Sequence, residues 1–314
     1  MTPLARVLIT APHFTERHLK SLAERFIVDN DPLGRWYTEE ELFDAIPSYD
    51  AVVAGLDPFP RRVIERGERL KIIARRGIGF DKVDLAACKE KGVYVTNTPV
   101  PDEHQAVAEF AVALLLDAVK NVTKAAGSMK RGLWERRAFL GRNVEGMTVG
   151  IVGLGNVGKR VARLVAAFGA RVVYYDPYVS SDEFRSVSLE ELFSTADAVS
   201  VHLVKTPETV GLIGAELLGS MKPGGVLVNT SRSEVVARGA LEGALASGRL
   251  TAALDVFDRE PPGEDPLLRL ENVLPTPHIA AYTAESFDGI DGACARNVIR
   301  VLEEGGRPDY VVNP

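Results

Sequence analysis

The sequence predicts an α/β protein with two domains, each built on a doubly wound parallel sheet. Its 314 residues exceed the length of about 150 that is typical of one domain, and 46% of them are apolar, which is enough for a sizeable core. Short β-branched runs alternate with helical stretches in two series along the chain, and a glycine-rich turn follows one of the runs directly. Such alternation is typical of successive βαβ units and therefore of parallel sheets.

The first series occupies the N-terminal third of the chain. Its predicted elements are strands over 7–10, 51–54, 72–74 and 93–96, and a helix over 85–91. A helical pattern over 284–303 is expected to return to this series, because the chain ends shortly afterwards. The first domain is therefore expected to be discontinuous, over 1–99 and 287–314, with a flavodoxin-like layout.

The second series follows a long amphipathic stretch from about Asp102 to Gly132, where apolar residues recur near helical spacing. We expect one helix there, long enough to bridge two domains. From Met147 onward the predicted elements are strands over 148–152, 171–175, 198–201, 225–229 and 251–254, and a helix over 157–168. The second domain is expected over 100–286.

Composition excludes several classes of protein. A net charge of −6 argues against a nucleic-acid-binding surface. The longest apolar stretch, 106–119, contains Glu109 and Asp117 and is shorter than the roughly 20 residues of a membrane span. The N-terminus lacks the features of a secretory signal, and Cys88 and Cys294 have no disulfide-framework or zinc-ligand spacing. We therefore expect a cytoplasmic protein without a metal site.

The glycine-rich turn is a candidate cofactor site. Gly153-Leu154-Gly155-Asn156-Val157-Gly158 follows the run 149–152 and begins a helical pattern, which is the context of the Rossmann dinucleotide fingerprint. The first glycine permits a tight turn, the second lets the backbone approach a pyrophosphate, and the third lets helix and strand pack closely. The alternative is a glycine-rich turn without a ligand.

A second signal supports the fingerprint. Asp176 ends the next strand, 23 residues after Gly153, close to the spacing of about 20 for the acid that binds the ribose hydroxyls. Pro177 and Tyr178 follow it in place of a cation, so a ribose 2′-phosphate would meet only a carboxylate. The sequence therefore favours NAD over NADP.

Three polar residues follow apolar segments of the second series and are candidate catalytic residues: Arg232, Glu260 and His278. Arg232 can bind the carboxylate of a 2-oxo acid and polarise its carbonyl group. His278 can give a proton to the carbonyl oxygen and take it back, with Glu260 raising the pKa of the ring and orienting it. The alternative for Arg232 and Glu260 is a solvated loop position, and Glu260 could belong to a simple turn with the two prolines after it.

The other histidines are weaker candidates. His202 follows the predicted strand 198–201 and either faces the cofactor or is satisfied by backbone groups. His13, His18 and His104 lie near predicted helix starts outside the second series of strands.

Motifs along the whole chain resemble the D-isomer-specific 2-hydroxyacid dehydrogenase family. They are Ala74–Asp84, which is similar to the family's substrate-domain loop, Ala106–Glu109, Gly132-Leu133-Trp134, the fingerprint, Met221–Gly224, Asp255–Pro261 and Thr276–His278. The resemblance implies that Arg232, Glu260 and His278 are the catalytic residues, and that the backbone N–H groups of Ile78 and Gly79 bind the substrate carboxylate, with Arg75 supporting their loop.

The resemblance also implies the cofactor contacts and the assembly. Asp176 would bind the ribose and Asp255 would lie near the nicotinamide amide. Further NAD contacts are expected from the fingerprint residues Gly153, Gly155, Asn156, Val157 and Gly158, and from His202 and Thr230. A homodimer through the long helix is implied as well.

Several residues and segments differ from the family's usual pattern or from that of particular relatives. Ser233 stands where a glycine usually follows the catalytic arginine, which affects the size of substrate that fits. Leu203–Thr206 lacks the usual proline after His202. Gly55–Pro58 lacks the arginines of phosphoglycerate-specific relatives, although Arg75 and Arg76 could compensate for them. Ile78 stands where phosphite-oxidising relatives carry a lysine.

These observations predict an NAD-dependent D-2-hydroxyacid dehydrogenase that reduces small 2-oxo acids such as glyoxylate or hydroxypyruvate, in a cleft between two domains that closes over the substrate. The first alternative is a short-type D-3-phosphoglycerate dehydrogenase of serine biosynthesis. A more remote one is an NAD-sensing regulator, because a corepressor family is similar in fold and has the same three residues. A binding protein with an inactive site ranks last, because no acid or base is missing.

Overall fold

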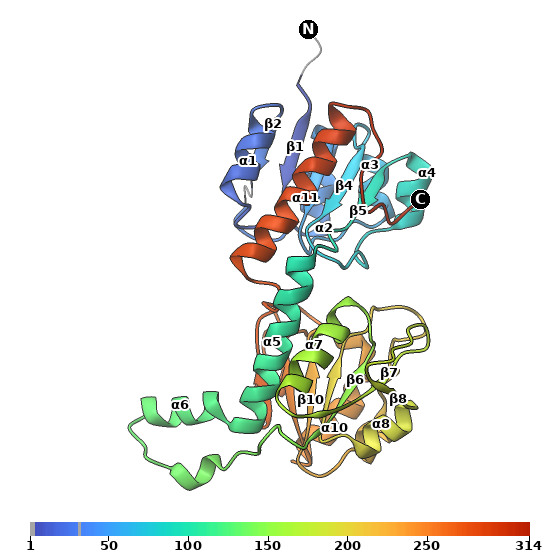
Figure 1. Ribbon diagram of the computed structural model, residues 1–314. Coiled ribbons are helices and arrows are strands. Elements are labelled where there is room, and N and C mark those ends of the chain that lie inside the picture. The colour runs from blue at the N-terminus through green and yellow to red at the C-terminus, as the bar shows by residue number, and fades with distance from the viewer. Residues whose placement is uncertain (1–3, 31–32) are drawn as a thin grey trace. The chain divides into compact units, whose positions relative to one another are not determined.

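A parallel sheet forms the centre of each of the two units into which the chain divides (Figure 1). The computed structural model describes residues 4–30 and 33–314. Unit 1 ends at Glu103 and resumes over Tyr282–Pro314, and unit 2 is His104–Ala281. The structure confirms the predicted α/β class with two parallel sheets.

The sheet of unit 1 has the strand order β2-β1-β3-β4-β5, and every neighbouring pair is parallel. The strands are β1 (Arg6–Ile9), β2 (Ile27–Asn30), β3 (Ala51–Ala54), β4 (Ile72–Arg75) and β5 (Tyr94–Thr96). The central strand β3 is buried along its whole length, as expected of a strand covered on both faces. Its carboxyl end leads into the loop Gly55–Pro58.

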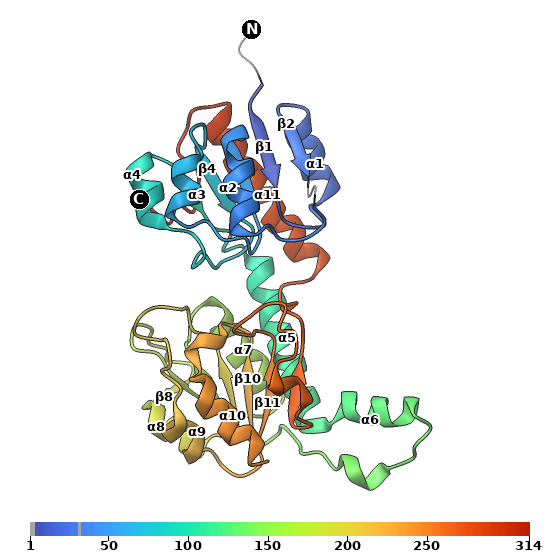
Figure 2. The same ribbon diagram turned by 180° about the vertical axis from the view of Figure 1, so that it is seen from behind.

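Helices cover both faces of this sheet. One face is covered by α1 (Glu16–Ala23) and α11 (Ala284–Leu302), which lie in front of the sheet in Figure 1. The other face is covered by α2 (Glu39–Ala45), α3 (Arg61–Arg66) and α4 (Leu85–Lys91), and the view from behind in Figure 2 shows α2 and α3 before the sheet. Cys294 and Val298 of α11 pack in the same cluster as Val53 and Ile72, so the C-terminal helix completes the core of unit 1.

The sheet of unit 2 has seven parallel strands in the order β12-β11-β10-β9-β6-β7-β8. They are β6 (Thr148–Val152), β7 (Arg171–Tyr175), β8 (Arg185–Ser186), β9 (Ala198–Val201), β10 (Gly225–Asn229), β11 (Leu250–Leu254) and β12 (Val273–Pro275). The strand order reverses between β6 and β9. In open α/β sheets ligands bind at the carboxyl ends of strands next to such a reversal.

The two faces of this sheet have separate cores. Helices α5 (Pro101–Lys120) and α7 (Asn156–Ala167) contribute to one apolar cluster, together with Val149, Ile151 and Val228. Helices α8 (Leu189–Thr195), α9 (Ala215–Ser220) and α10 (Arg238–Ala246) contribute to the other, and Figure 2 shows these three on the near side of the sheet.

The long helix predicted from Asp102 to Gly132 is wrong as a single element. Helix α5 ends at Lys120, and a separate helix α6 (Val122–Lys130) begins after Asn121. Asn121 has a left-handed φ of +59°, a conformation that asparagine tolerates better than most residues and that breaks a helix. The Asp117 carboxylate then accepts the backbone N–H of Thr123 at 2.8 Å, which stabilises the start of the new direction.

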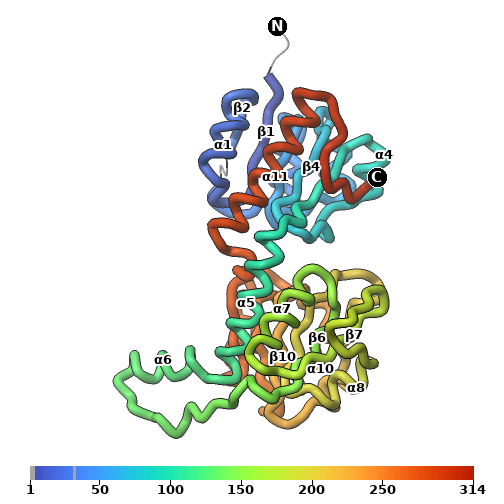
Figure 3. The backbone as a smooth tube through the Cα atoms, viewed as in Figure 1, coloured from blue at the N-terminus to red at the C-terminus, as the bar shows by residue number. Residues whose placement is uncertain are grey.

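Residues 121–143 form an arm of unit 2, which contains α6 and the short 3₁₀ helix η2 (Arg136–Phe139) (Figure 3). Several large apolar side chains of the arm are exposed, and Trp134 (74%) and Leu140 (88%) are the most exposed of them. By contrast, the apolar side of α5 is buried in the core of unit 2, with Ala108, Ala111 and Leu115 in the cluster. No helix in the described part of the chain is both long and apolar enough to cross a membrane.

Candidate active site

The fingerprint turn lies between β6 and α7, beside the reversal of strand order. Gly153 has φ +91°, which favours glycine, and its N–H donates to Tyr175 O at 2.8 Å. A Cβ on Gly158 would lie 2.0 Å from the Gly153 carbonyl oxygen, so only glycine permits this approach of helix to strand. A Cβ on Gly155 would meet nothing within 4 Å. The turn therefore leaves open space where the sequence predicts a pyrophosphate, and the residues fit a dinucleotide.

Asp176, at the end of β7, is tied to the fingerprint. One carboxylate oxygen accepts the N–H of Leu154 at 2.7 Å, and the other accepts the N–H groups of Tyr178 and Val179 at 2.8 and 3.0 Å. The exposed residues Pro177 and Tyr178 follow it, without a cation. A carboxylate oriented in this way, beside the fingerprint, fits a ribose with free hydroxyl groups.

Two further predicted cofactor residues, His202 and Thr230, directly follow β9 and β10. The ring Nε2 of His202 lies 2.8 Å from the hydroxyl of Ser200, so a side chain and not the backbone satisfies it. Burial lowers the pKa of His202 to about 3, which leaves the ring neutral at pH 7. The buried hydroxyl oxygen of Thr230 has no hydrogen-bond partner among the described residues. Because a buried hydroxyl group rarely remains unsatisfied, this oxygen is well suited to a bound ligand.

Arg232 lies after the carboxyl end of β10 in a short loop that Asn229 organises. The Asn229 side chain donates to Arg232 O at 2.8 Å and accepts from both the backbone N–H and the hydroxyl of Ser231. The Arg232 side chain is half-buried, and its Nη1 donates to Ser231 O at 2.8 Å. Its neighbour Ser233 begins the 3₁₀ helix η3 (Ser233–Val235), and its hydroxyl donates to Glu234.

Glu260 and His278 form a direct pair. The Nδ1 atom of His278 lies 2.7 Å from Oε2 of Glu260, and Oε1 accepts the backbone N–H of Phe257 at 3.1 Å. The carboxylate is therefore held on both oxygens. With Nδ1 directed at the carboxylate, Nε2 is the ring nitrogen that can exchange a proton with a substrate. Glu260 follows β11 and His278 follows β12, two adjacent parallel strands.

Asp255 holds the turn that carries His278. It is fully buried, and its carboxylate accepts hydrogen bonds from the Thr276 hydroxyl at 2.6 Å and from the backbone N–H groups of Ile279 and Ala280 at 3.0 and 2.8 Å. Burial raises the pKa of Asp255, although these hydrogen bonds act in the opposite direction. His278 itself has a left-handed φ of +56°. Three hydrogen bonds to one carboxylate stabilise that unusual turn.

The predicted substrate-binding residues of unit 1 are Arg75, which ends β4, and Ile78 and Gly79 in the loop that follows. The buried Arg75 side chain donates to Gly79 O at 3.1 Å and to Ala54 O at 3.0 Å, and Asn97 donates to Ile78 O at 2.9 Å. Both loop carbonyls are thus held from within unit 1. The N–H groups of Ile78 and Gly79 have no acceptor among the described residues, as expected of amides that bind an anion.

Arg76 belongs to a buried ion pair. Its guanidinium contacts the Asp291 carboxylate of α11 at 2.5 and 3.1 Å, and Nη1 donates to Pro12 O at 3.1 Å. The guanidinium also lies 4.3 Å from the centre of the Phe287 ring. The Arg76 and Asp291 side chains are 6% and 0% exposed. Arg76 therefore stabilises the packing of α11 and is committed to protein groups.

Comparisons with known proteins decide the family. Residues 112–280 match the NAD binding domain of the D-isomer specific 2-hydroxyacid dehydrogenases. The chain is 40% identical over 255 residues to a hydroxypyruvate reductase of Thermotoga maritima, and the match covers 79% of this chain and 83% of that protein. The chain belongs to the D-isomer specific 2-hydroxyacid dehydrogenase family. This confirms the resemblance inferred from the motifs.

Two other known proteins are similar to this chain over long stretches. A D-3-phosphoglycerate dehydrogenase of Mycobacterium bovis is 43% identical over 279 residues, which cover 87% of this chain. The chain spans only about half of that relative's length, since the match covers 53% of it. A crystal structure of a protein from Thermus thermophilus has a TM-score of 0.90 at 35% identity, covering 98% of this chain and 99% of that chain.

The sequence analysis missed two residues that hold the candidate catalytic side chains of this protein in place. Asn229 organises the Arg232 loop, and Thr276 joins Asp255 to the His278 turn. Asn229 could have been found from its sequence, because a polar residue at the end of a completely apolar run needs a partner. Thr276 gives no such signal, because its partner lies 21 residues away on another strand.

Proposed function

We propose that this protein is an NAD-dependent D-2-hydroxyacid dehydrogenase that works as a reductase of small 2-oxo acids such as glyoxylate or hydroxypyruvate. The observation that carries the proposal is the Glu260–His278 pair, with 2.7 Å between carboxylate and ring, in the same unit as the NAD fingerprint. The name of the Thermotoga maritima relative, hydroxypyruvate reductase, supports this substrate class.

The residues have separate roles in the proposed reaction. Arg232 binds the substrate carboxylate through its planar guanidinium and polarises the neighbouring carbonyl group. His278 gives the proton on Nε2 to the carbonyl oxygen, while Glu260 orients the ring and stabilises its charged form. The N–H groups of Ile78 and Gly79, in the loop that Arg75 supports, are substrate-binding groups suited to a carboxylate. When bound, NADH supplies the hydride.

The proposed cofactor contacts follow the fingerprint and the strand ends. Gly153, Gly155, Asn156, Val157 and Gly158 receive the pyrophosphate at the start of α7, and Asp176 binds the ribose hydroxyls. Thr230 offers its unpartnered hydroxyl group to the bound ligand. Asp255, which follows β11, is the proposed neighbour of the nicotinamide amide, and His202, which follows β9, is a further proposed cofactor contact.

The experiment is an initial-rate assay that follows nicotinamide absorbance with NADH and with NADPH. The substrates are glyoxylate, hydroxypyruvate, phosphohydroxypyruvate, pyruvate and bulkier 2-oxo acids. NADH-linked reduction of glyoxylate or hydroxypyruvate supports the proposal, and its loss in Arg232→Ala tests the mechanism. If NADH binds but no 2-oxo acid is reduced, the NAD-sensing regulator becomes the better interpretation.

A phosphoglycerate dehydrogenase is the alternative, and the name of the Mycobacterium bovis relative favours it. Against it, the two arginines that could take the place of the missing phosphate ligands are engaged elsewhere. Arg75 is 3% exposed and donates to two backbone carbonyls, and Arg76 pairs with Asp291. Preferential reduction of phosphohydroxypyruvate over hydroxypyruvate in the same assay would favour the alternative.

We also propose that the protein is a cytoplasmic homodimer. The exposed apolar side chains of the arm, Val122, Met129, Leu133, Trp134 and Leu140, support a second copy of the chain as their cover. Two buried, unpaired cysteines, Cys88 and Cys294, support a reducing compartment. Light scattering after gel filtration tests the dimer, and a monomer at micromolar concentration would contradict it.

A further inference from the structure

The segment that carries Glu260 has little apolar anchoring of its own. Phe257 before it and Leu267 after it are buried in the core of unit 2, but every residue over 258–266 is exposed or half-buried. A segment without buried side chains opens easily unless polar contacts hold it. Besides the hydrogen bonds that Glu260 makes itself, the position of its carboxylate therefore depends on what holds the two ends of this segment.

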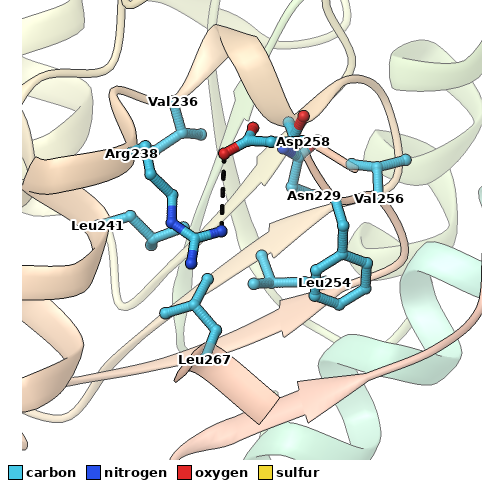
Figure 4. A pocket seen from close by; sticks show the side chains of 10 residues that line it. Asn229, Val236, Arg238, Leu241, Leu254, Val256, Asp258 and Leu267 are labelled. Atoms are coloured by element: carbon cyan, nitrogen blue, oxygen red, sulfur yellow. Dashed lines mark ion pairs between the residues drawn. The ribbon is translucent and has the colours of Figure 1, made fainter. Parts of the chain in front are cut away.

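One guanidinium contacts both sides of the segment. Arg238, the first residue of α10, donates to the two carboxylate oxygens of Asp265 at 2.8 and 2.5 Å. Its Nη1 also lies 3.6 Å from the carboxylate of Asp258, the ion pair drawn in Figure 4. Asp258 precedes Glu260 by two residues and Asp265 follows it by five. Arg238 thus connects the two sides of the loop to one helix.

The contact with Asp265 is partly shielded from water, since the Arg238 side chain is 30% exposed. The Asp265 side chain is 10% exposed, and the hydrogen bonds from Arg238 are the main cause that holds its pKa below the usual range. The same carboxylate also accepts the N–H of Leu267 and so caps the 3₁₀ helix η4 (Pro266–Arg269). Paired, planar hydrogen bonds of this kind give geometric definition as well as energy.

The surroundings of Arg238 show that its side chain binds other residues of the protein and leaves no room for a ligand. The pocket beside it is lined by Val236, Leu241, Leu254, Phe257 and Leu267 and has a volume of about 20 Å³. That is about the room that a single water molecule needs. The pocket is therefore too small for a substrate or a phosphate, and the charge of Arg238 is already matched by Asp265 and Glu242.

We propose that Arg238 is a positioning residue for proton transfer: by holding Asp258 and Asp265, it keeps the Glu260 carboxylate against the His278 ring. The inference rests on the proposed function. A pair that meets at 2.7 Å depends on its support, because misplacing a reacting group by about 1 Å can cost on the order of 100-fold in rate.

The test compares Arg238→Met with Arg185→Met. Methionine keeps much of the apolar stem and removes the guanidinium. Arg185 is a matched control, because it also pairs with one carboxylate of unit 2, Glu191, at 2.6 Å, in an exposed part of the sheet edge. We expect kcat to fall at least about tenfold in Arg238→Met, with KM for NADH within about twofold of the parent value. The control should match the parent protein in both.

A double-mutant cycle separates positioning from general weakening of the fold. If Arg238 acts through Glu260, adding Arg238→Met to Glu260→Gln should lower kcat by less than about twofold further. An equal fold loss in both backgrounds, or an unchanged kcat in the single variant, would overturn the proposal. If Arg238→Met does not fold, Asp265→Asn is used in its place in the double-mutant cycle. Asparagine keeps the shape of the side chain and removes the charge that pairs with Arg238.

A spectroscopic measurement keeps this proposal separate from the proposed function. The chain has 5 histidines, so the ring N–H proton of His278 can be assigned by its loss in His278→Gln. A proton held between Nδ1 and a carboxylate exchanges slowly and resonates at low field. We expect that signal to weaken in Arg238→Met and to persist in Arg185→Met, even if no 2-oxo acid is reduced. A signal that persists unchanged in Arg238→Met would overturn the inference.

Discussion

Replacement of Glu260 by glutamine removes the negative charge beside His278 and keeps the shape of the side chain. The Oε2–Nδ1 distance is 2.7 Å, and the Glu260 and His278 side chains are 21% and 32% exposed. A hydrogen bond to a charged group contributes about 1.5–3 kcal/mol, and partial exposure places this pair near the lower value. Since about 1.4 kcal/mol is a factor of ten, we expect kcat/KM for reduction to fall about 10- to 30-fold at pH 7.

The effect follows from the contact between the carboxylate and the ring. Oε2 of Glu260 lies 2.7 Å from Nδ1 of His278, which leaves Nε2 to give its proton to the substrate, and glutamine removes the negative charge from that contact. The assay is the NADH absorbance change with hydroxypyruvate or glyoxylate.

Glu264→Gln is the matched control. This residue lies in the same loop, its side chain is 93% exposed, and its contact with Arg269 is 3.4 Å long. The same chemical change there should leave kcat/KM unchanged. Equal activity of Glu260→Gln and the parent protein would refute the assignment of Glu260, and an equal loss in both variants would point to general disturbance of the loop.

Three further predictions concern the cofactor turn, cofactor choice and stability. Gly158→Ala places a methyl group 2.0 Å from the Gly153 carbonyl oxygen, so we expect weaker NADH binding by fluorescence titration and a lower Tm. Unchanged NADH affinity and Tm would contradict the close packing. Asp176→Asn removes the charge that disfavours a 2′-phosphate, so the preference for NADH over NADPH in kcat/KM should fall about tenfold. An unchanged ratio of the two kcat/KM values would mean that the ribose binds elsewhere. Asp291→Asn leaves the buried Arg76 without a counter-charge, so the free energy of unfolding in urea should fall by about 3–5 kcal/mol. A loss under about 1 kcal/mol would mean that water or backbone groups replace the carboxylate.

Much of the fold could be predicted because its central strands carry a strong local signal. The predicted strands 148–152, 171–175, 198–201 and 225–229 coincide with β6, β7, β9 and β10. Central strands of a parallel sheet are covered on both faces and so read as continuous apolar runs. The strands β2, β8 and β12 were not predicted. All three lie at sheet edges, and the residues of β2 and β8 are exposed or only half-buried.

The predicted helix from Asp102 to Gly132 was wrong for a related reason. Its apolar spacing continues across Asn121, and nothing in the periodicity indicates that this one residue turns left-handed. The break is stabilised by the contact of Asp117 with Thr123, six residues apart, which is longer than the spacing that helical periodicity reports. A local pattern therefore predicted two helices as one.

The sequence by itself determined the class of fold, the family, the fingerprint turn and the types of polar residue at the strand ends. These features are local, because glycine spacing, apolar runs and strand-end positions are set by neighbours in the chain. Only the tertiary structure decided which side chains meet. Glu260 reaches His278 across two adjacent strands, Arg76 is paired with Asp291 of the C-terminal helix, and Arg238 holds a loop that begins about 20 residues later. Such contacts depend on how distant segments pack, and packing is decided by the whole core.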